Sequence, residues 1–298
     1  MRRSLLVILC VTVLTTNAWV QTQELKRYLH DHYTNQIFII RNFLSGDHLS
    51  YDSLGSPTKR ALAGDWTETG FVRIDGSRVE KNHLVLNAQR MVVIFIDKRF
   101  QLRAMQHPQK AKIDIELSGT PSSQSVDAVL SKIFLNSHDS FVDLVPGYWR
   151  PCVSSGLARK DLRCAFAPDL LAILGAKTKG PQPQLKEASI APSAEGIFHM
   201  DDAGHMDDPG VSVPKATYAP QPEYSEAARA LHFQGTLAIA LVVNKDGRAG
   251  NFRIVRPLGA GLDVRTVQEE QNWKFQPAKK NREPVAAEIL VETKFTLY

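Results

Sequence analysis

The chain has 298 residues, 43% of them hydrophobic and 22% charged, with 18 glycines, 16 prolines and a net charge of +5. This is ordinary globular composition, so it excludes a fibrous, collagenous or wholly disordered protein. The charge excess is small and comes partly from Arg2 and Arg3, so it gives no reason to expect a nucleic-acid partner. The length fits two folded domains.

The amino terminus has the three parts of a secretory signal peptide. Arg2 and Arg3 form a basic start, an apolar run over residues 5–14 follows, and small residues up to Ala18 allow cleavage before Trp19. We therefore predict a signal peptide over residues 1–18 that is cleaved on export to the periplasm. The alternative is a retained inner-membrane anchor, although a membrane span needs about 20 apolar residues.

Cleavage would remove Cys10 and leave Cys152 and Cys164 as the only cysteines. An isolated pair in an exported protein is usually bridged, so we predict a disulfide between them. Two unpaired buried thiols are the alternative. A metal site is not indicated here, because no second cysteine pair and no histidine at ligand spacing lies nearby.

A change in composition separates two halves of the chain. Seven of the 16 prolines fall in residues 176–222, with little apolar periodicity. This predicts a Pro-rich linker over residues 176–209, with one domain over 23–175 and another over 210–298. The linker repeats His-Met-Asp-Asp at 199–202 and 205–208, which could bind a metal ion weakly. We favour an acidic, solvated linker and predict no metal and no cofactor.

Residues 23–175 are expected to be mostly β-structure of unknown function, opened by a short amphipathic helix. One further helix, capped by Ser123, places five apolar residues on one face: Val126, Val129, Leu130, Ile133 and Phe134. No zinc-enzyme histidine motif, nucleophile elbow or glycine-rich phosphate loop is present. Nothing therefore indicates an enzyme, and we predict a non-enzymatic protein.

The region from about residue 210 onward shows clearer local patterns. Ser225 can cap a short helix that ends at Gly235, and residues 236–243 then alternate as a strand does. Asp246-Gly247 is a hairpin turn into a second strand. Asp263 can cap a second helix that reaches Trp273, and residues 285–297 alternate as a long final strand. This order predicts an α+β domain in which two helices cover one face of a three-stranded antiparallel sheet.

Short motifs in this region occur in the order found in one known family. They are Gln221-Pro222-Glu223-Tyr224-Ser225 continuing to Leu231, then Gly235, Val243–Arg248, Trp273–Ala278 and Pro284-Val285. Residues 210–298 therefore resemble the C-terminal domain of the TonB energy-transducer family. In that family the domain binds outer-membrane TonB-dependent receptors by adding a short receptor segment, the TonB box, to its sheet as a strand.

The resemblance implies two sets of residues. Candidate partner-binding residues are Gln221, Pro222 and Tyr224, with Ile289 and Val291 in the final strand. The other motif residues have plain structural roles. Glycines permit turn conformations, aromatic side chains fill the space between helix and sheet, and prolines limit where the last strand starts. These structural residues are Gly235, Asp246, Gly247, Trp273, Phe275, Pro277 and Pro284.

Three features depart from the family pattern. Ser225 stands where a second proline is usual, Arg282 stands where a turn glycine is usual, and the amino terminus resembles a cleaved signal. We therefore predict a periplasmic protein that binds a receptor or similar envelope partner, with an ExbB/ExbD-type complex as a further partner only if residues 1–18 are retained. The alternative is a scaffold or assembly protein that uses this domain for protein interaction, or as a homodimer, without energy transduction.

Overall fold

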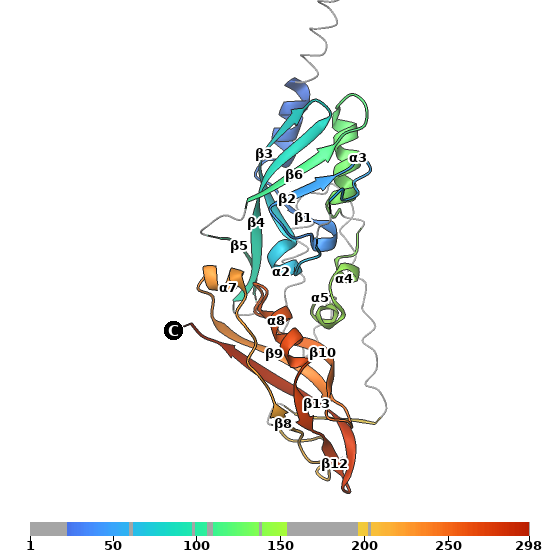
Figure 1. Cartoon of the computed structure of the whole chain (residues 1–298), viewed down its shortest axis with the longest axis vertical. Helices are drawn as coiled ribbons and strands as arrows, with labels where there is room; N and C mark the ends of the chain where they lie inside the picture. Colours follow the sequence, from blue (N-terminus) through green and yellow to red (C-terminus); the bar gives the residue numbers. More distant parts are fainter. Residues whose placement is uncertain are drawn as a thin grey trace, which may run out of the picture. The chain divides into compact units, whose positions relative to one another are not determined.

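The computed structural model describes residues 23–59, 62–96, 99–105, 110–136, 139–153, 196–201 and 204–297 (Figure 1). The predicted signal peptide, Cys164 and residues 176–195 of the predicted linker lie outside these ranges. The chain divides into two compact units. Unit 1 falls within Met1–Gly64, Thr69–Met91 and Pro108–Leu135, and unit 2 within Asp65–Glu68, Val92–His107 and Asn136–Tyr298. Among the described residues, no helix is both long and apolar enough to span a membrane.

Unit 1 is built on a mixed sheet whose strands follow the order β1-β3-β4-β6-β2. β2 and β6 pair in parallel, and the other neighbours are antiparallel. The expected β content of this half is present. The bounds are β1 Ile37–Ile39, β2 His48–Tyr51, β3 Phe71–Glu80, β4 His83–Ile96 and β6 Lys110–Glu116, with a 3₁₀ turn, η1, at Arg41–Phe43.

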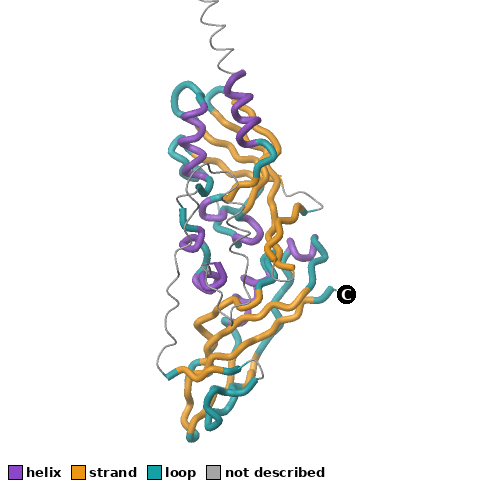
Figure 2. The backbone as a smooth tube through the Cα atoms, turned by 180° about the vertical axis from the view of Figure 1, so that it is seen from behind, coloured by secondary structure: helices purple, strands orange, loops and turns teal. Residues whose placement is uncertain are grey.

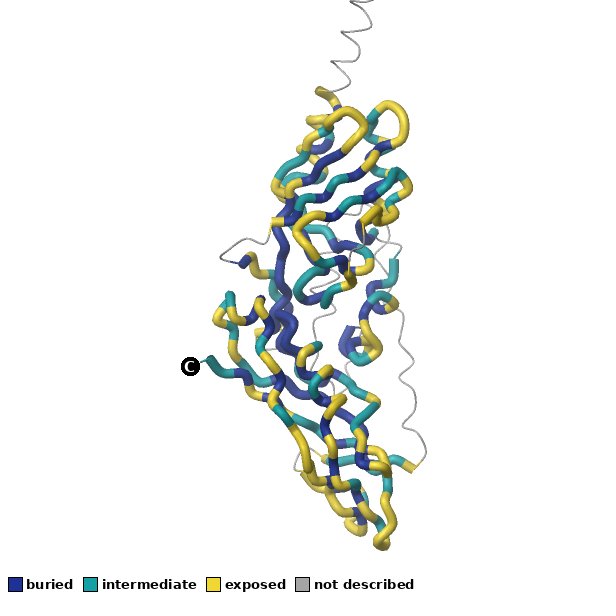
Figure 3. Tube along the Cα trace, in the orientation of Figure 1, coloured by how far each residue is buried: buried dark blue, intermediate teal, exposed yellow. Residues whose placement is uncertain are grey.

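Two helices pack on the sheet of unit 1 through one apolar cluster. Residues 23–33 are helical, and α3 spans Ser123–Ile133. The four predicted apolar residues of α3 and Phe134 just after it are buried in the cluster, together with Leu25 and Leu29 of the first helix. Buried stretches of the chain are dark blue in Figure 3. Ser122 caps α3, one residue before the predicted cap, because its hydroxyl accepts the N–H of Ser125.

Unit 2 is built on a five-stranded sheet, two strands more than predicted. Its antiparallel path is β10-β9-β13-β12, and β7 pairs with β13 in parallel. The three predicted strands are β9, β10 and β13. The two additional strands are β12, formed by residues 278–280 that pair with β13, and β7, formed by residues of the predicted linker. The bounds are β7 Ile197–His199, β9 Gly235–Val243, β10 Ala249–Arg256, β12 Ala278–Lys280 and β13 Glu283–Phe295. A separate ribbon pairs β8 (Lys215–Tyr218) with β11 (Lys274–Gln276).

The described residues of the two His-Met-Asp-Asp repeats, 199–201 and 205–208, form a hairpin instead of a solvated linker. Met200 and Met206 lie opposite each other, and the N–H of Asp207 donates to the carbonyl of His199 (2.8 Å). Met206 packs with Ala278 and Ala287, and Phe198 lies against this cluster. These apolar side chains explain why residues 196–201 and 204–209 adopt a defined structure, because their packing against β12 and β13 removes apolar surface from water. In the described part of the chain, no three metal-ligand side chains gather.

Two helices belong to the region that was predicted to be α+β. α7 spans Glu226–Ala230 and begins as predicted, since the Ser225 hydroxyl accepts the N–H of Ala228 (3.0 Å). α8 spans Leu262–Glu270, and its cap is Gly261, not Asp263. Asp263 instead accepts the backbone N–H groups of Leu258 and Gly259 (3.0 and 2.5 Å), which fixes the loop before the helix.

Segments from the first half of the chain complete unit 2. The N–H of Phe95 in β4 donates to Leu258 (2.8 Å), and the N–H of Ala260 donates to Val93 (2.6 Å). The rings of Trp66 and Trp149 lie 4.9 Å apart. The additional elements are α2 Trp66–Thr69, β5 Arg99–Ala104, α4 Phe141–Leu144, η2 Gly147–Trp149 and α5 Arg150–Val153. Unit 2 therefore contains more than the predicted domain over residues 210–298.

Candidate strand-binding edge

The two edges of β13 are used differently. On one side, residues 287–295 pair with β9 without a register shift. β12 pairs with residues 283–285, which precede this ladder, and on the other side β7 pairs with residues 286–288. Within the described ranges, residues 289–295 have no strand on this second side (Figure 2). We call this stretch the free edge of β13.

The register of β7 shows which backbone groups face the free edge. The carbonyl of Glu288 accepts the N–H of Met200 just after β7 (3.0 Å), so the backbone groups of Glu288 face that side. Backbone groups alternate in direction along a strand. Those of Leu290, Glu292 and Lys294 therefore face outward at the free edge.

Ile289 and Val291, which were predicted to contact the partner, are placed differently. Their backbone groups face β9, in the ladder that pairs them with Leu241 and Ile239. Ile289 is buried in a cluster with Trp273 and Phe275, and Val291 packs against it partly buried. Their side chains therefore belong to the core, and the outward positions are the residues between and after them.

The opposite face of this sheet is covered by ion pairs. Arg253 on β10 reaches Glu288 on β13 (3.0 Å), and Arg256 reaches Glu292 (2.5 Å). Both pairs cross the central strand β9, where Ala238 and Ala240 are buried. Small residues on β9 leave room for the arginine side chains, and Ala238 and Ala240 form a small apolar cluster with Val255, against which Leu290 packs.

The predicted partner-binding segment before α7 is held against the core. Gln221 is exposed, whereas Pro222 is buried. The ring of Tyr224 packs edge-on against Phe295 of β13 (5.2 Å between centroids), and the indole N–H of Trp273 donates to the Pro220 carbonyl (3.0 Å). Residues 220–224 are thus anchored to core side chains at both ends, and the side chains of Gln221 and Glu223 are exposed.

The structural motif residues account for the local geometry. Gly247 has φ 80°, and a Cβ on it would lie 2.2 Å from the Phe275 carbonyl oxygen, so this turn requires glycine. Asp246 completes the turn by accepting the N–H of Arg248 (3.1 Å). Gly235 does not serve a turn, contrary to the prediction. It begins β9, where a Cβ would meet Leu258 at 2.6 Å.

The remaining motif residues lie near these turns and strands. Trp273 and Phe275 are buried in one apolar cluster, as expected for aromatic side chains beside a sheet. Pro277 separates β11 from β12, and Pro284 is exposed near the start of β13, where it pairs with Lys279. Proline has no backbone N–H to donate, and this is tolerated at an edge or at the start of a strand, where no neighbouring strand accepts a hydrogen bond from that position.

Two carboxyl groups of α8, those of Asp263 and Glu270, are buried, and that of Glu68 nearby is half-buried; the sequence did not indicate any of the three as a functional group. Burial raises the pKa of Glu270 to about 8 and that of Asp263 to about 7. Burial, followed by the charge of Asp65, raises the pKa of Glu68 to about 7. The sequence could have indicated that Glu270 is buried. It lies seven residues after Asp263, on the same helix face as Thr266 and Val267.

Cys152 is buried in unit 2, with its sulfur 3.5 Å from the carbonyl oxygen of Ile254 on β10. Cys164 lies outside the described residues. The disulfide between these two cysteines therefore stays a prediction.

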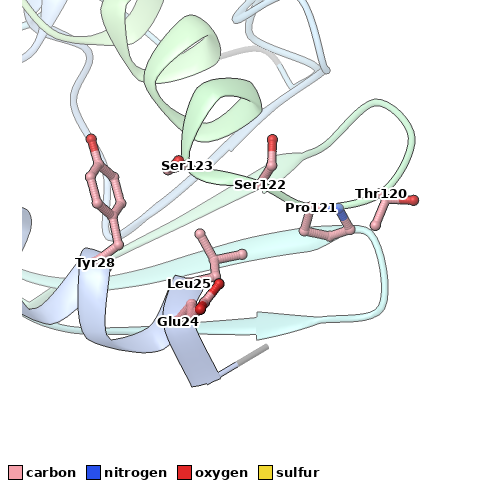
Figure 4. A pocket seen from close by; sticks show the side chains of 7 residues that line it. All are labelled: Glu24, Leu25, Tyr28, Thr120, Pro121, Ser122 and Ser123. Atoms are coloured by element: carbon pink, nitrogen blue, oxygen red, sulfur yellow. The ribbon is translucent and has the colours of Figure 1, made fainter. Parts of the chain in front are cut away.

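A hollow in unit 1 is a weaker candidate site. It lies between the first helix and the start of α3, lined by Glu24, Leu25, Tyr28, Thr120, Pro121, Ser122 and Ser123 (Figure 4). One acidic group and several hydroxyls line it, and the Ser122 hydroxyl is already used to cap α3. The lining offers neither a metal-ligand set nor a nucleophile with a neighbouring base, so we assign it no role.

The fold and the free edge of β13 define an α+β domain with a strand available for pairing. Residues 220–297 match the family described as the Gram-negative bacterial TonB protein C-terminal, so the chain carries a TonB C-terminal domain. The chain is also similar to the solution structure of the Pseudomonas aeruginosa TonB C-terminal domain. That match has 17% sequence identity and a TM-score of 0.23, and covers 31% of this chain and 93% of the other. No curated protein matches the chain.

Proposed function

We propose that this protein is a non-enzymatic, periplasmic member of the TonB family that binds an outer-membrane TonB-dependent receptor, or a similar envelope partner, by strand addition. The observation that carries the proposal is the free edge of β13, where Leu290, Glu292 and Lys294 direct their backbone groups outward. Backbone hydrogen bonds to such an edge supply affinity without requiring a particular partner sequence.

The free edge carries charged side chains that limit unwanted pairing and leave a short stretch open to a partner strand. Open edges invite unwanted pairing, and charged side chains on the edge reduce it. Glu292 and Lys294 supply such charges, and β7 closes the edge at residue 288. A partner strand therefore has about seven residues of β13 to pair with. Because ordering a flexible peptide opposes binding, we expect a dissociation constant on the order of micromolar or weaker.

Energy coupling belongs to this proposal only if residues 1–18 are retained, because force requires an anchor and an ExbB/ExbD-type partner. If they are cleaved, the same edge serves a periplasmic binding protein. A second copy of the chain is the rival occupant, since two free edges could pair and give a homodimer.

The decisive experiment titrates the full exported chain with seven-residue peptides from TonB boxes of receptors in the same organism. Glu292→Pro removes the outward N–H, and Glu292→Ala is the matched control that removes the same side chain but keeps the N–H. Losing one backbone bond and leaving its acceptor unpaired costs about 1–3 kcal/mol, so Glu292→Pro should weaken binding about fivefold to 150-fold. Glu292→Ala should bind nearly as wild type.

Two further measurements complete the test. Gln221→Ala should weaken binding while the thermal midpoint stays nearly constant, because an exposed polar residue contributes little to stability. Sedimentation of the peptide-free chain reports whether the edge is occupied by a second copy. If no peptide binds, or if the proline and alanine variants bind equally well, strand addition at this edge is refuted. The scaffold function is then the better account.

A further inference from the structure

Glu270 is a buried acid for which the described residues supply no counter-charge. It is the last residue of α8 and is fully buried, and neither carboxyl oxygen has a hydrogen-bond partner of good geometry among the described residues. Its polar neighbour is the hydroxyl of Thr293 on β13. A buried carboxylate normally has a cation or several donors around it, so Glu270 lacks the surroundings that an ionised side chain needs.

The position of Glu270 on α8 also opposes ionisation. The C-terminal end of a helix carries partial negative charge from unpaired carbonyl groups, which disfavours an anion there. Burial is the largest cause of the raised pKa of Glu270, the Thr293 hydroxyl opposes it, and no charged side chain contributes. The raised pKa of Glu270 does not arise from the other groups with raised pKa values. These groups are Asp65, Glu68, Asp263 and Tyr148.

Thr293 connects this acid to the free edge. It lies between Glu292 and Lys294, whose backbone groups face outward, and its own backbone groups pair with Leu237 of β9. An ionised Glu270 must gain water or move away, and both changes disturb its contact with Thr293 on this part of β13. The outward amides on either side of Thr293 would then lose their fixed positions.

We propose that Glu270 is a protonation switch for the free edge of β13, with the neutral acid holding the edge in its binding form and the ionised acid releasing it. This inference rests on the proposed function, because it names the regulation of the same edge. Glu270 acts through Thr293 and α8, and is therefore a positioning residue that does not contact the partner.

The sign of the pH dependence follows from the direction of the shift. The pKa of Glu270 rises from 4.5 to about 8 in the folded chain. Its contribution to stability is therefore fully present below about pH 4.5 and is lost as the pH rises through about 8. The folded protein should hold a neutral Glu270 at pH 6.5 and an ionised one at pH 9.

The experiment compares peptide affinity of the full chain from pH 6.5 to 9 with that of Glu270→Gln. In the wild type, affinity should fall above about pH 8, by at most about tenfold per pH unit for one proton. Glu270→Gln keeps the shape and remains neutral, so its affinity should stay constant. Glu269→Gln is the matched control, because the same change one residue earlier, at a half-buried position, should keep the wild-type profile. If Glu270→Gln does not fold, Glu270→Met supplies a neutral side chain of similar length.

A measurement without peptide separates failure of this inference from failure of the proposed function. Hydrogen-exchange protection of Val291 and Thr293, whose N–H groups face β9, should fall above pH 8 in the wild type but not in Glu270→Gln, after correction for the intrinsic effect of pH. If protection changes in this way and no peptide binds, the switch stands and strand addition fails. If wild type and Glu270→Gln show the same pH dependence in protection and affinity, the switch is refuted.

Discussion

Replacing Trp273 with alanine tests whether the core beneath the free edge has the packing that the structure shows. Trp273 is 9% exposed and lies in a cluster with Leu241, Phe275 and Ile289. Removing a buried indole costs about 3–5 kcal/mol, because lost transfer energy and a residual cavity add together. The lost hydrogen bond to the Pro220 carbonyl, 3.0 Å long, adds about 1 kcal/mol.

Trp273→Phe is the matched control, since it keeps an aromatic ring and removes the indole N–H. We expect Trp273→Phe to cost about 1–2 kcal/mol, well below the alanine variant, because most of the cavity stays filled. Urea unfolding of the full chain gives the free energies, and hydrogen exchange in β9 and β13 shows whether the loss is local to unit 2. Equal losses in the two variants, or a loss below about 1 kcal/mol for Trp273→Ala, would refute the packing described here.

Two further predictions concern a turn and a bridge. Asn281 and Arg282 have φ angles of 51° and 71° in the turn before β13, so Arg282→Gly should raise stability by about 1 kcal/mol through relief of the left-handed conformation. Arg282→Ala should give no such gain, and an equal rise in both thermal midpoints would contradict this explanation. Cys152 and Cys164 should be oxidised in the exported protein, so alkylation without reductant and mass measurement should find no free thiol. Two labelled cysteines would rule out the bridge.

The α+β elements of the C-terminal region were predictable because their signals are local. Strict alternation placed β9 and the final strand, and the Asp246-Gly247 turn joined β9 to β10. The cap at Ser225 also followed from sequence alone. Each of these features depends on neighbouring residues, so tertiary contacts had little opportunity to change them.

The additional strands and the outward positions of the free edge depend on distant contacts and were not predicted. β7 is only three residues long and becomes a strand because residues 286–288 of β13 offer a partner. The resemblance to the family indicated the final strand as the pairing strand, which stays a proposal, but Ile289 and Val291 face β9 and the core. Only the register of β7 and β9 on β13 shows that Leu290, Glu292 and Lys294 face outward.

The domain that matches the TonB family is one part of a larger unit, and Glu68 shows why this matters. Its carboxyl group accepts the N–H of Ala227 in α7. It also lies against the cap of α8, since a Cβ on Gly261 would come within 2.5 Å of the Glu68 carboxyl carbon.

An acidic group is favourable at a helix N-terminus, and here one side chain serves two helices. The adjacent Thr67 hydroxyl accepts the N–H of Gly261 (2.8 Å) from 194 residues away in sequence. A fragment that begins at residue 210 would lose both contacts and expose the N–H groups of both helices. The free edge of β13 therefore depends on residues that precede the TonB-like sequence, and its binding should be measured in the full chain.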